Sequence, residues 1–549
     1  MKLKNVTASL VLLTLLGPLR AEVYAGLEMC WVFDDQMVLQ ADRTVPIWGQ
    51  TEPGASVTVR FGEQEKTAVA DADGEWAVRL DPMPVSAEGR ELQIEAPTGS
   101  KVFKDVLVGD VWIASGQSNM AQPPAVQSTG GEQYKDWTPN PLLRTFNVPF
   151  NKWSAEPQTR QFPWETRVTN WLRWKPAGGG TSAVPFFFGK MLQEETGRPI
   201  GLLLVPLGAS GAEAWVPMDV MAGDPEFAGF AAQSQEYMDR HAENRADFQK
   251  TVAEWEQRKQ EAEARGEEFK ERRPQTGMNA AFWPRWWAGA LYNSHIAPLR
   301  NMAVKGVIWY QGENNAAGHG GAVKTSEGYQ RLMHLLIKSW REQFEQPELP
   351  FYQVQLSMFN WNDFNNRRKR DANQPGGWSI IREAQEQVAR DVSHSGIAIT
   401  VDVGDRGNIH PPNKRPMGER LAKLVLRDVY GKDVIADGPA YAGHEVENGR
   451  IRVRFEHTHG GLAVLPREEV PDGRLVGFAI AGADRNFVWA EAEIDGETVV
   501  VWSEEVPEPV AVRYAYAQYH DVNLGNGAGL PAAPFRTDDW PLWKEKEDK

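Results

Sequence analysis

Five short, mainly apolar runs constrain the fold of this chain more than any other feature. They occupy residues 106–114, 200–205, 304–310, 351–356 and 397–401, and amphipathic helical patterns accompany them at 184–195, 330–344, 383–392 and 417–429. Strands that are apolar along their length are covered on both faces, as in a parallel sheet between two layers of helices. We therefore predict an α/β domain whose functional side chains collect at the carboxyl ends of its strands.

Apolar and polar residues alternate on either side of this region. The alternation covers residues 45–49, 56–61, 75–80 and 91–96 before it, and 450–455 and 498–502 after it. A period of two predicts antiparallel strands, and 549 residues are too many for one core. We expect a β-sandwich-like N-terminal domain at 26–105, the α/β domain at 106–435 and a C-terminal β domain at 436–549.

Residues 227–273 interrupt the α/β region with a densely charged segment. Phe248, Val252 and Trp255 follow one another at four- and three-residue steps, which gives one narrow apolar stripe. We interpret this segment as a helical excursion that faces solvent and serves as a structural appendage.

The N-terminus has the pattern of an export signal. Lys2 and Lys4 precede an apolar stretch at 6–16, and small residues near Ala25 offer a cleavage site. We predict a signal peptide at 1–25 and a periplasmic or extracellular protein. This stretch is too short to span a bilayer, and no later segment reaches about 18 apolar residues.

The net charge of −15 argues against binding to nucleic acid. The sequence contains no His-Glu-x-x-His pattern for a metal. We therefore expect neither a metal nor another cofactor.

The first apolar run ends in a turn that contains Ser118. Residues 111–120 read Val-Trp-Ile-Ala-Ser-Gly-Gln-Ser-Asn-Met. A serine just after a buried parallel strand is well placed to attack a carbonyl carbon. The N–H groups of a following helix start would stabilise the negative charge that develops. Ser118 is our candidate nucleophile; the alternative is a serine that only caps a helix.

A serine nucleophile needs a neighbouring base. His410 follows the run at 397–401 by a short loop, which places it at the same sheet edge as Ser118. We predict that His410 is this base; the alternative is a histidine on a surface loop.

Two more strands deliver polar groups to this edge. Gly208 follows the run at 200–205, and Gln311 and Asn315 follow the run at 304–310. An oxyanion hole needs such N–H donors. We expect it to use the backbone N–H groups of Ser118 and Gly208 and the side-chain amide of Gln311 or Asn315. Further site candidates are Gln117, Glu313 and Asn314.

Several blocks of this sequence resemble the sialate O-acetylesterase family of carbohydrate esterases, within the SGNH (Ser-Gly-Asn-His) hydrolases. The blocks occur in the family's order over nearly the whole mature chain. Residues 309–316, Trp-Tyr-Gln-Gly-Glu-Asn-Asn-Ala, resemble the family's W-Y-Q-G-E-S-N-A. The other matching blocks are 33–40, 116–120, 291–299, 409–414, 513–514 and 529–538.

The resemblance implies a flavodoxin-like, three-layer α/β/α catalytic domain with a parallel sheet, flanked by β domains. It also implies a serine esterase that removes O-acetyl groups from a sugar or polysaccharide through an acetyl-Ser118 intermediate. Three alternatives remain: an esterase of a non-acetyl ester, a peptidase or lipase that uses the same serine, and a carbohydrate-binding protein with a decayed catalytic site.

The chain departs from the family pattern near the histidine. Family members often carry an aspartate two residues before it, and many SGNH enzymes carry one three residues before it. Asn408 and Gly407 occupy these positions here. We expect Asp405 to be the triad acid, with Asp402 as second choice; the third option is a Ser118–His410 dyad oriented by a backbone carbonyl.

Overall fold

A seven-strand path of one sheet forms the centre of the molecule. The computed structural model describes residues 26–123, 139–148, 153–157, 173–178, 180–276, 282–317, 325–359, 376–517 and 519–541. The strands of this path are β8 (Gly99–Gly116), β9 (Asn140–Asn147), β10 (Lys175–Ala177), β11 (Ile200–Pro206), β12 (Gly306–Tyr310), β13 (Phe351–Val354) and β14 (Ser395–Ala398), in the order β10-β9-β11-β8-β12-β13-β14.

Six of these strands are parallel: β9 pairs with β11, and the other five follow the order second, first, third, fourth, fifth along the chain. β11 and β12 flank β8, β13 pairs with β12, and β14 pairs with β13. All residues of β11, β12 and β13 are buried, because helices cover both faces of the sheet. The predicted α/β domain with a parallel sheet is confirmed.

Two pairs of helices provide this cover. Helix α3 (Ala183–Thr196) packs against α11 (Arg415–Asp428), and α8 (Ser326–Gln343) packs against α10 (Gly376–Asp391). Right-handed crossovers between parallel strands place the two pairs on opposite faces of the sheet. Short helices α1 (Ser118–Ala121), α4 (Met218–Ala222) and α7 (Glu313–Ala316) follow strand ends or connect the layers.

Four of the N-terminal strands share one sheet with the central strands through β8, whereas β1 (Glu28–Met29), β3 (Val45–Gln50) and β6 (Glu75–Leu80) form a separate three-stranded sheet. Strand β8 pairs with β2 and β7 in its first part and with β11 and β12 in its second part. The predicted domain boundary at 105/106 therefore falls inside one strand. The N-terminal strands before β8 are β1 (Glu28–Met29), β2 (Val38–Gln40), β3 (Val45–Gln50), β4 (Ser56–Phe61), β5 (Gln64–Val69), β6 (Glu75–Leu80) and β7 (Ser86–Ala96).

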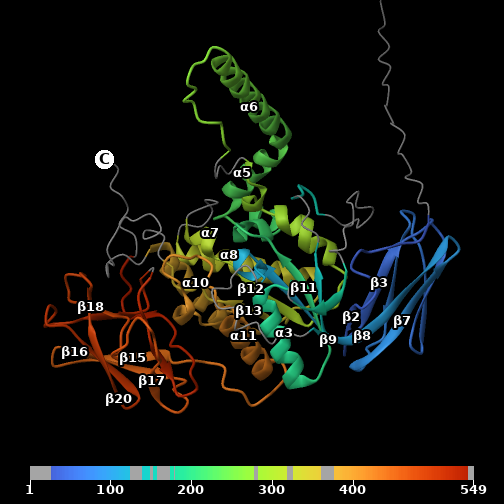
Figure 1. Ribbon diagram of the computed structural model, residues 1–549. Coiled ribbons are helices and arrows are strands. Elements are labelled where there is room, and N and C mark those ends of the chain that lie inside the picture. Colours follow the sequence, from blue (N-terminus) through green and yellow to red (C-terminus); the bar gives the residue numbers. More distant parts are fainter. Residues whose placement is uncertain are drawn as a thin grey trace, which may run out of the picture.

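The C-terminal strands lie on the other side of the central domain (Figure 1). They form two four-stranded antiparallel sheets and one two-stranded ladder with a separate hydrophobic core. These strands are β15 (Ala440–Glu447), β16 (Arg450–Glu456), β17 (Leu462–Val464), β18 (Phe478–Ala481), β19 (Val488–Trp489), β20 (Glu491–Asp495), β21 (Thr498–Trp502), β22 (Ala511–Tyr514), β23 (Leu524–Asn526) and β24 (Phe535–Arg536).

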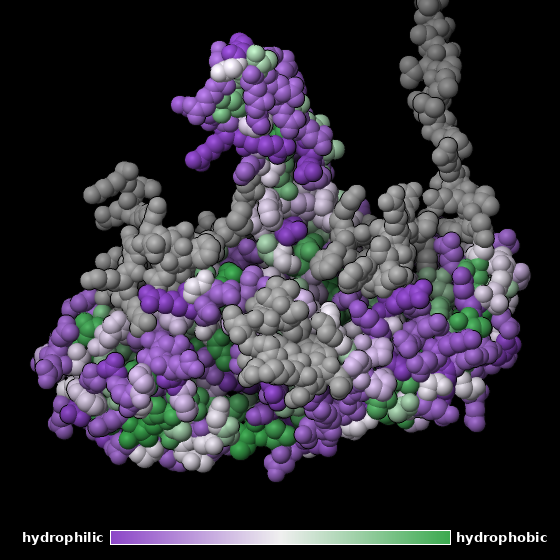
Figure 2. All heavy atoms as spheres, in the orientation of Figure 1, coloured by the Kyte–Doolittle hydropathy of each residue, from purple (hydrophilic) through white to green (hydrophobic). Residues whose placement is uncertain are grey.

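The charged segment predicted as a helical excursion projects from the central domain (Figure 1). It consists of α5 (Ala228–Asp239) and α6 (His241–Ala264), and its surface is mainly hydrophilic (Figure 2). Trp255 of the predicted stripe is buried against Phe269 of the returning chain, with ring centroids 5.5 Å apart. The apolar stripe therefore stabilises the excursion itself.

Most of the predicted elements are confirmed to within seven residues at each end, and two strands of the central sheet were missed. β9 and β10 lie at one edge of the central sheet, where the sequence analysis predicted no strand. The predicted signal segment, residues 1–25, lies outside the described residues. Over the ranges that the structure describes, no helix combines the length and the hydrophobicity needed to cross a membrane.

Candidate active site

Ser118 is the first residue of α1, directly beyond β8. Gly116 ends that strand with φ +131°, and a Cβ there would overlap the carbonyl oxygen of Tyr310. Only glycine allows the chain to turn so sharply beside β12. The N-cap of α1 is Gln117, and no side chain caps this helix. The alternative role of Ser118 as a helix cap is therefore excluded, and its hydroxyl is free for other contacts.

In the structure, the imidazole of His410 contacts the hydroxyl of Ser118. The Nε2 atom of His410 lies 2.9 Å from Oγ of Ser118, and both residues are partly exposed. The backbone around His410 is held from two sides: its N–H donates to Oδ1 of Asn408 at 2.9 Å, and the carbonyl of Ile409 accepts from Nδ2 of Asn119 at 3.1 Å.

The structure does not bring either predicted acid onto His410. Oδ1 of Asp405 accepts the backbone N–H groups of Gly407 and Asn408, both at 2.9 Å, and so closes the loop on itself. Asp402 forms an ion pair with Arg420, with both N–O distances 2.6 Å. Among the described residues, the His410 ring has one hydrogen bond, which is the bond to Ser118. In the described part of the chain neither of these acids nor a backbone carbonyl accepts from the ring, so only the Ser118–His410 contact of the predicted arrangement is present.

A buried chain of polar side chains lies behind the pair. Lys414 donates to Oδ1 of Asn119, whose Nδ2 donates to Oε1 of Glu313. All three side chains are buried. Burial lowers the pKa of Lys414 and raises that of Glu313. Glu313, predicted as a site residue, therefore contacts Asn119 and not His410.

This surrounding also sets the protonation of His410. Partial burial, and to a smaller extent the nearby Lys414 ammonium, lower the pKa of His410 to about 4. The imidazole is neutral at neutral pH, which is the form that accepts a proton from a serine.

Gly208 lies directly over Ser118. A Cβ on Gly208 would be 3.5 Å from Cβ of Ser118. The carbonyl oxygens of three consecutive residues after β11 are held by side-chain donors. Arg285 donates to that of Gly208 at 2.8 Å, Trp286 to that of Ala209 at 2.9 Å, and Gln311 and Asn314 to that of Ser210 at 3.1 and 3.2 Å.

Gln311 and Asn315 do not present a free amide to Ser118, which corrects their predicted role. Nε2 of Gln311 donates to the carbonyl of Ser210 and, at 2.7 Å, to Oδ1 of Asn315. Nδ2 of Asn315 lies 3.0 Å from both carboxylate oxygens of Glu213. Because both amides are buried and occupied, they position the Gly208 loop. The backbone N–H groups of Ser118 and Gly208 remain as candidate oxyanion donors.

Sequence reasoning did not single out four residues around this site: Arg285, Trp286, Glu213 and Lys414. Glu213 is fully buried, and burial raises its pKa to about 7. Gln117 was a candidate, and its Oε1 lies 3.4 and 3.5 Å from the N–H groups of Gly312 and Asn314. The signals for the missed residues were the tryptophan-rich run at 283–287 and the lysine of the histidine block.

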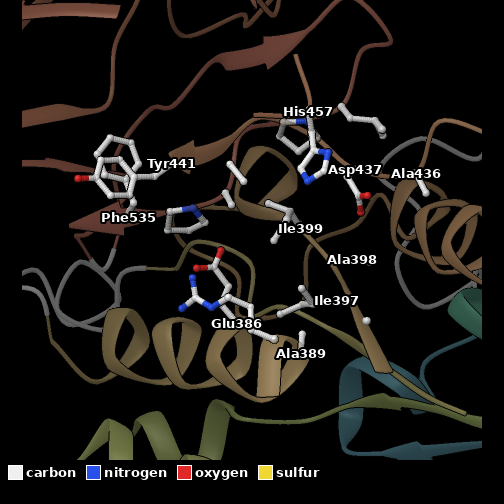
Figure 3. Close-up of a pocket in the computed structure, with 18 of the residues that line it drawn as sticks. Glu386, Ala389, Ile397, Ala398, Ile399, Ala436, Asp437, Tyr441, His457 and Phe535 are labelled. Atoms are coloured by element: carbon white, nitrogen blue, oxygen red, sulfur yellow. The ribbon is translucent and has the colours of Figure 1, made fainter. Parts of the chain in front are cut away.

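A cavity of about 390 Å³ lies elsewhere, between α10, β14 and the C-terminal strands. Figure 3 shows Glu386, Tyr441, His457 and Phe535 around it. Neither Ser118 nor His410 lines this cavity. In the described part of the chain, no three His, Cys, Asp or Glu side chains are grouped so that they could hold a metal ion.

Comparisons with known proteins agree on one family. The sequence model of the carbohydrate esterases described as sialic acid-specific acetylesterases matches residues 275–427. The crystal structure of a carbohydrate acetylesterase from Xanthomonas citri is 31% identical, with a TM-score of 0.73 over 94% of this chain and 100% of that one. Sialate O-acetylesterase of Mus musculus is 26% identical over 93% of this chain and 94% of its own length. The Homo sapiens protein is 25% identical over 75% and 73%.

The chain has a parallel α/β sheet, a Ser–His contact beyond the carboxyl edge of that sheet, and these relatives. Together they define the class of the protein, which is a carboxylic ester hydrolase. Within that class, the chain belongs to the sialate O-acetylesterase family of carbohydrate esterases.

Proposed function

We propose that this protein removes O-acetyl groups from a carbohydrate, with Ser118 as nucleophile and His410 as general base. The observation that carries the proposal is the 2.9 Å contact between Oγ of Ser118 and Nε2 of His410 beneath Gly208. The relatives are named as acetylesterases of sialic acid or of carbohydrates, which supports an acetylated sugar or polysaccharide as substrate.

The reaction takes two steps. Neutral His410 removes the proton of Ser118 while Oγ attacks the acetyl carbonyl, and the backbone N–H groups of Ser118 and Gly208 bind the oxyanion. The tetrahedral intermediate collapses, His410 protonates the leaving sugar oxygen, and acetyl-Ser118 remains. His410 then takes a proton from water, whose oxygen attacks the acetyl carbon; acetate leaves and Ser118 regains its proton.

The proposed pair works without a carboxylate on the histidine. Asn408 and Asn119 hold the N–H and the carbonyl of the peptide group between Ile409 and His410, which restricts the position of the ring. A depressed pKa keeps the base neutral, although it also weakens its affinity for the serine proton. We infer a dyad enzyme of the SGNH type, in which hydrogen bonds to the loop replace the orienting acid.

We further propose that the protein is exported. The charged and apolar pattern at residues 1–25 supports a signal peptide. Export to the periplasm or the medium would place the enzyme where polymeric or glycan-bound acetylated sugars occur. Comparing the N-terminus of the protein purified from cells with that of the printed sequence tests this proposal.

Acetate release tests the catalytic proposal. Wild type, Ser118→Ala and His410→Ala are assayed with a small aryl acetate, an O-acetylated sialic acid and acetylated xylan. We expect both variants to lose almost all activity, and His394→Ala, which removes an exposed histidine near Glu348, to retain it. Labelling of Ser118 by a fluorophosphonate should likewise depend on His410. A folded wild type that releases no acetate and takes no label would instead support a decayed, carbohydrate-binding protein.

A further inference from the structure

Arg285 is separated from the nucleophile Ser118 in space by one residue, Gly208. It belongs to a short 3₁₀ turn, Pro284–Trp286, and its Nη1 donates to the carbonyl oxygen of Gly208 at 2.8 Å. Gly208 in turn packs against Ser118. Arg285 is partly exposed, and its guanidinium contacts the loop that packs on the nucleophile.

No carboxylate among the described residues forms an ion pair with Arg285. The two buried glutamates of the site are occupied elsewhere: Glu213 accepts from Asn315, and Glu313 accepts from Asn119. Burial lowers the pKa of Arg285, and no acidic neighbour compensates for this loss of hydration. The chain carries 74 acidic residues and 59 basic ones, so an arginine without an acidic partner at this position is unexpected.

Aromatic rings fix the orientation of this guanidinium. Its centre lies 5.2 Å from the centroid of the Trp283 ring, and Trp283 stacks on Trp286 at 5.5 Å with an interplanar angle of 21°. Trp286 also donates to the carbonyl of Ala209. A guanidinium held against an indole face keeps the N–H groups along its edge available for a planar acceptor.

We propose that Arg285 is a specificity-determining residue that binds the carboxylate of an acidic acetylated sugar while Ser118 attacks its acetyl group. This inference rests on the proposed function and narrows its substrate class. An arginine has five N–H donors. The Gly208 carbonyl takes one, and the others suit two-point binding of a carboxylate. Sialic acids and uronic acids both carry this group, whereas the sugars of xylan backbones do not.

The test compares two substrates that differ only in charge: an O-acetylated N-acetylneuraminic acid and its methyl ester. Arg285→Gln keeps a donor for the Gly208 carbonyl and removes the charge. For the free acid, we expect this variant to raise KM about 10- to 100-fold, as the loss of a charge-assisted hydrogen bond does, with kcat nearly unchanged. For the methyl ester, KM should stay within about threefold of wild type. Arg285→Lys should fall between wild type and Arg285→Gln.

Trp286→Phe is the matched control, because it removes the adjacent hydrogen bond to the loop and leaves the guanidinium in place. It should affect both substrates equally. The proposal is overturned if Arg285→Gln also affects both substrates equally, or if Trp286→Phe changes their ratio as Arg285→Gln does. Assays of the same variants on acetylated polygalacturonan and acetylated xylan distinguish uronic acids from sialic acids and from neutral sugars. The proposal is also refuted if the enzyme hydrolyses only xylan and Arg285→Gln does not change that activity.

Failure of the proposed function gives a different result. If wild type does not hydrolyse even the aryl acetate, calorimetric titration of Ser118→Ala with the free acid and with the methyl ester still measures recognition. Binding of the acid that is lost in the Ser118→Ala/Arg285→Gln double variant supports the role of Arg285 independently of catalysis. Equal binding by both proteins contradicts it.

Discussion

Replacing Asp405 with asparagine separates a dyad from a triad. The carboxylate of Asp405 accepts two backbone N–H groups of its own loop through one oxygen, Oδ1. An asparagine side chain offers the same acceptor in the same place, so the loop and the position of His410 should persist. We expect kcat/KM to change by less than about threefold, because surface changes that keep their hydrogen bonds alter free energies by only about 0.5 kcal/mol.

A triad acid behaves quite differently. The same aspartate-to-asparagine change at an acid that orients the histidine lowers kcat by about 10⁴-fold. The two interpretations of Asp405 therefore differ by more than three orders of magnitude, which is far beyond the error of an assay.

The assay is hydrolysis of a soluble aryl acetate by Asp405→Asn, with Asp402→Asn as the matched variant. Asp402→Asn weakens the buried ion pair with Arg420 and should cost about 2–4 kcal/mol of stability, with little loss of activity per folded molecule. Denaturant unfolding measures that stability. A drop in kcat/KM of more than about 100-fold for folded Asp405→Asn would refute the dyad.

Three further predictions follow from the site and its supports. Because the pKa of His410 is lowered to about 4, kcat/KM should hold from neutral pH down to about pH 5 and fall as the imidazole is protonated; a midpoint near 6.5 in the pH–rate profile would contradict this. Gly116→Ala should destabilise the fold by more than about 4 kcal/mol or prevent folding, whereas Gly54→Ala, at φ +78° with no atom within 4 Å, should cost only about 1–2 kcal/mol in denaturant unfolding; equal effects would refute the clash with Tyr310. Burial raises the pKa of Glu213 from 4.5 to about 7, so wild-type stability falls as pH rises through this interval, and Glu213→Gln should stabilise the protein by about 2 kcal/mol more at pH 8 than at pH 5; a gain in melting temperature independent of pH would exclude this cause.

The sequence was sufficient to predict five strands of the central sheet and the two residues in contact. Buried parallel strands have a simple signature, and groups that follow consecutive strands meet at one edge whatever the loops do. Ser118 and His410 could therefore be paired across 292 positions before their 2.9 Å contact was known. The strand β9 was missed because most of the sequence around it shows no regular alternation of apolar and polar residues.

The direction of individual polar side chains could not be predicted. Whether Gln311 donates to an oxyanion or to the carbonyl of Ser210 depends on shifts of a few ångströms within a buried network. Asp405 has the charge of a triad acid and nearly the expected spacing from His410. In the structure, however, its carboxylate accepts backbone N–H groups of the same loop. Arg285 lies 77 positions from Gly208 and in no recognised block, so only the fold could place it beside the site.

The long strand β8 has a consequence for how this enzyme can be dissected. Its eighteen residues belong to two packing units at once, and Ser118 follows its last residue by two positions. A fragment that starts at residue 106 would begin in mid-strand and would lack β2 and β7, the two strands that pair with the first part of β8. The hydrolase region therefore cannot be separated from the N-terminal strands, and fusions, truncations and domain exchanges should keep the chain from residue 26 onward. A substitution that disrupts the N-terminal ladder, far from the serine, should also affect the nucleophile, because one continuous strand connects the two.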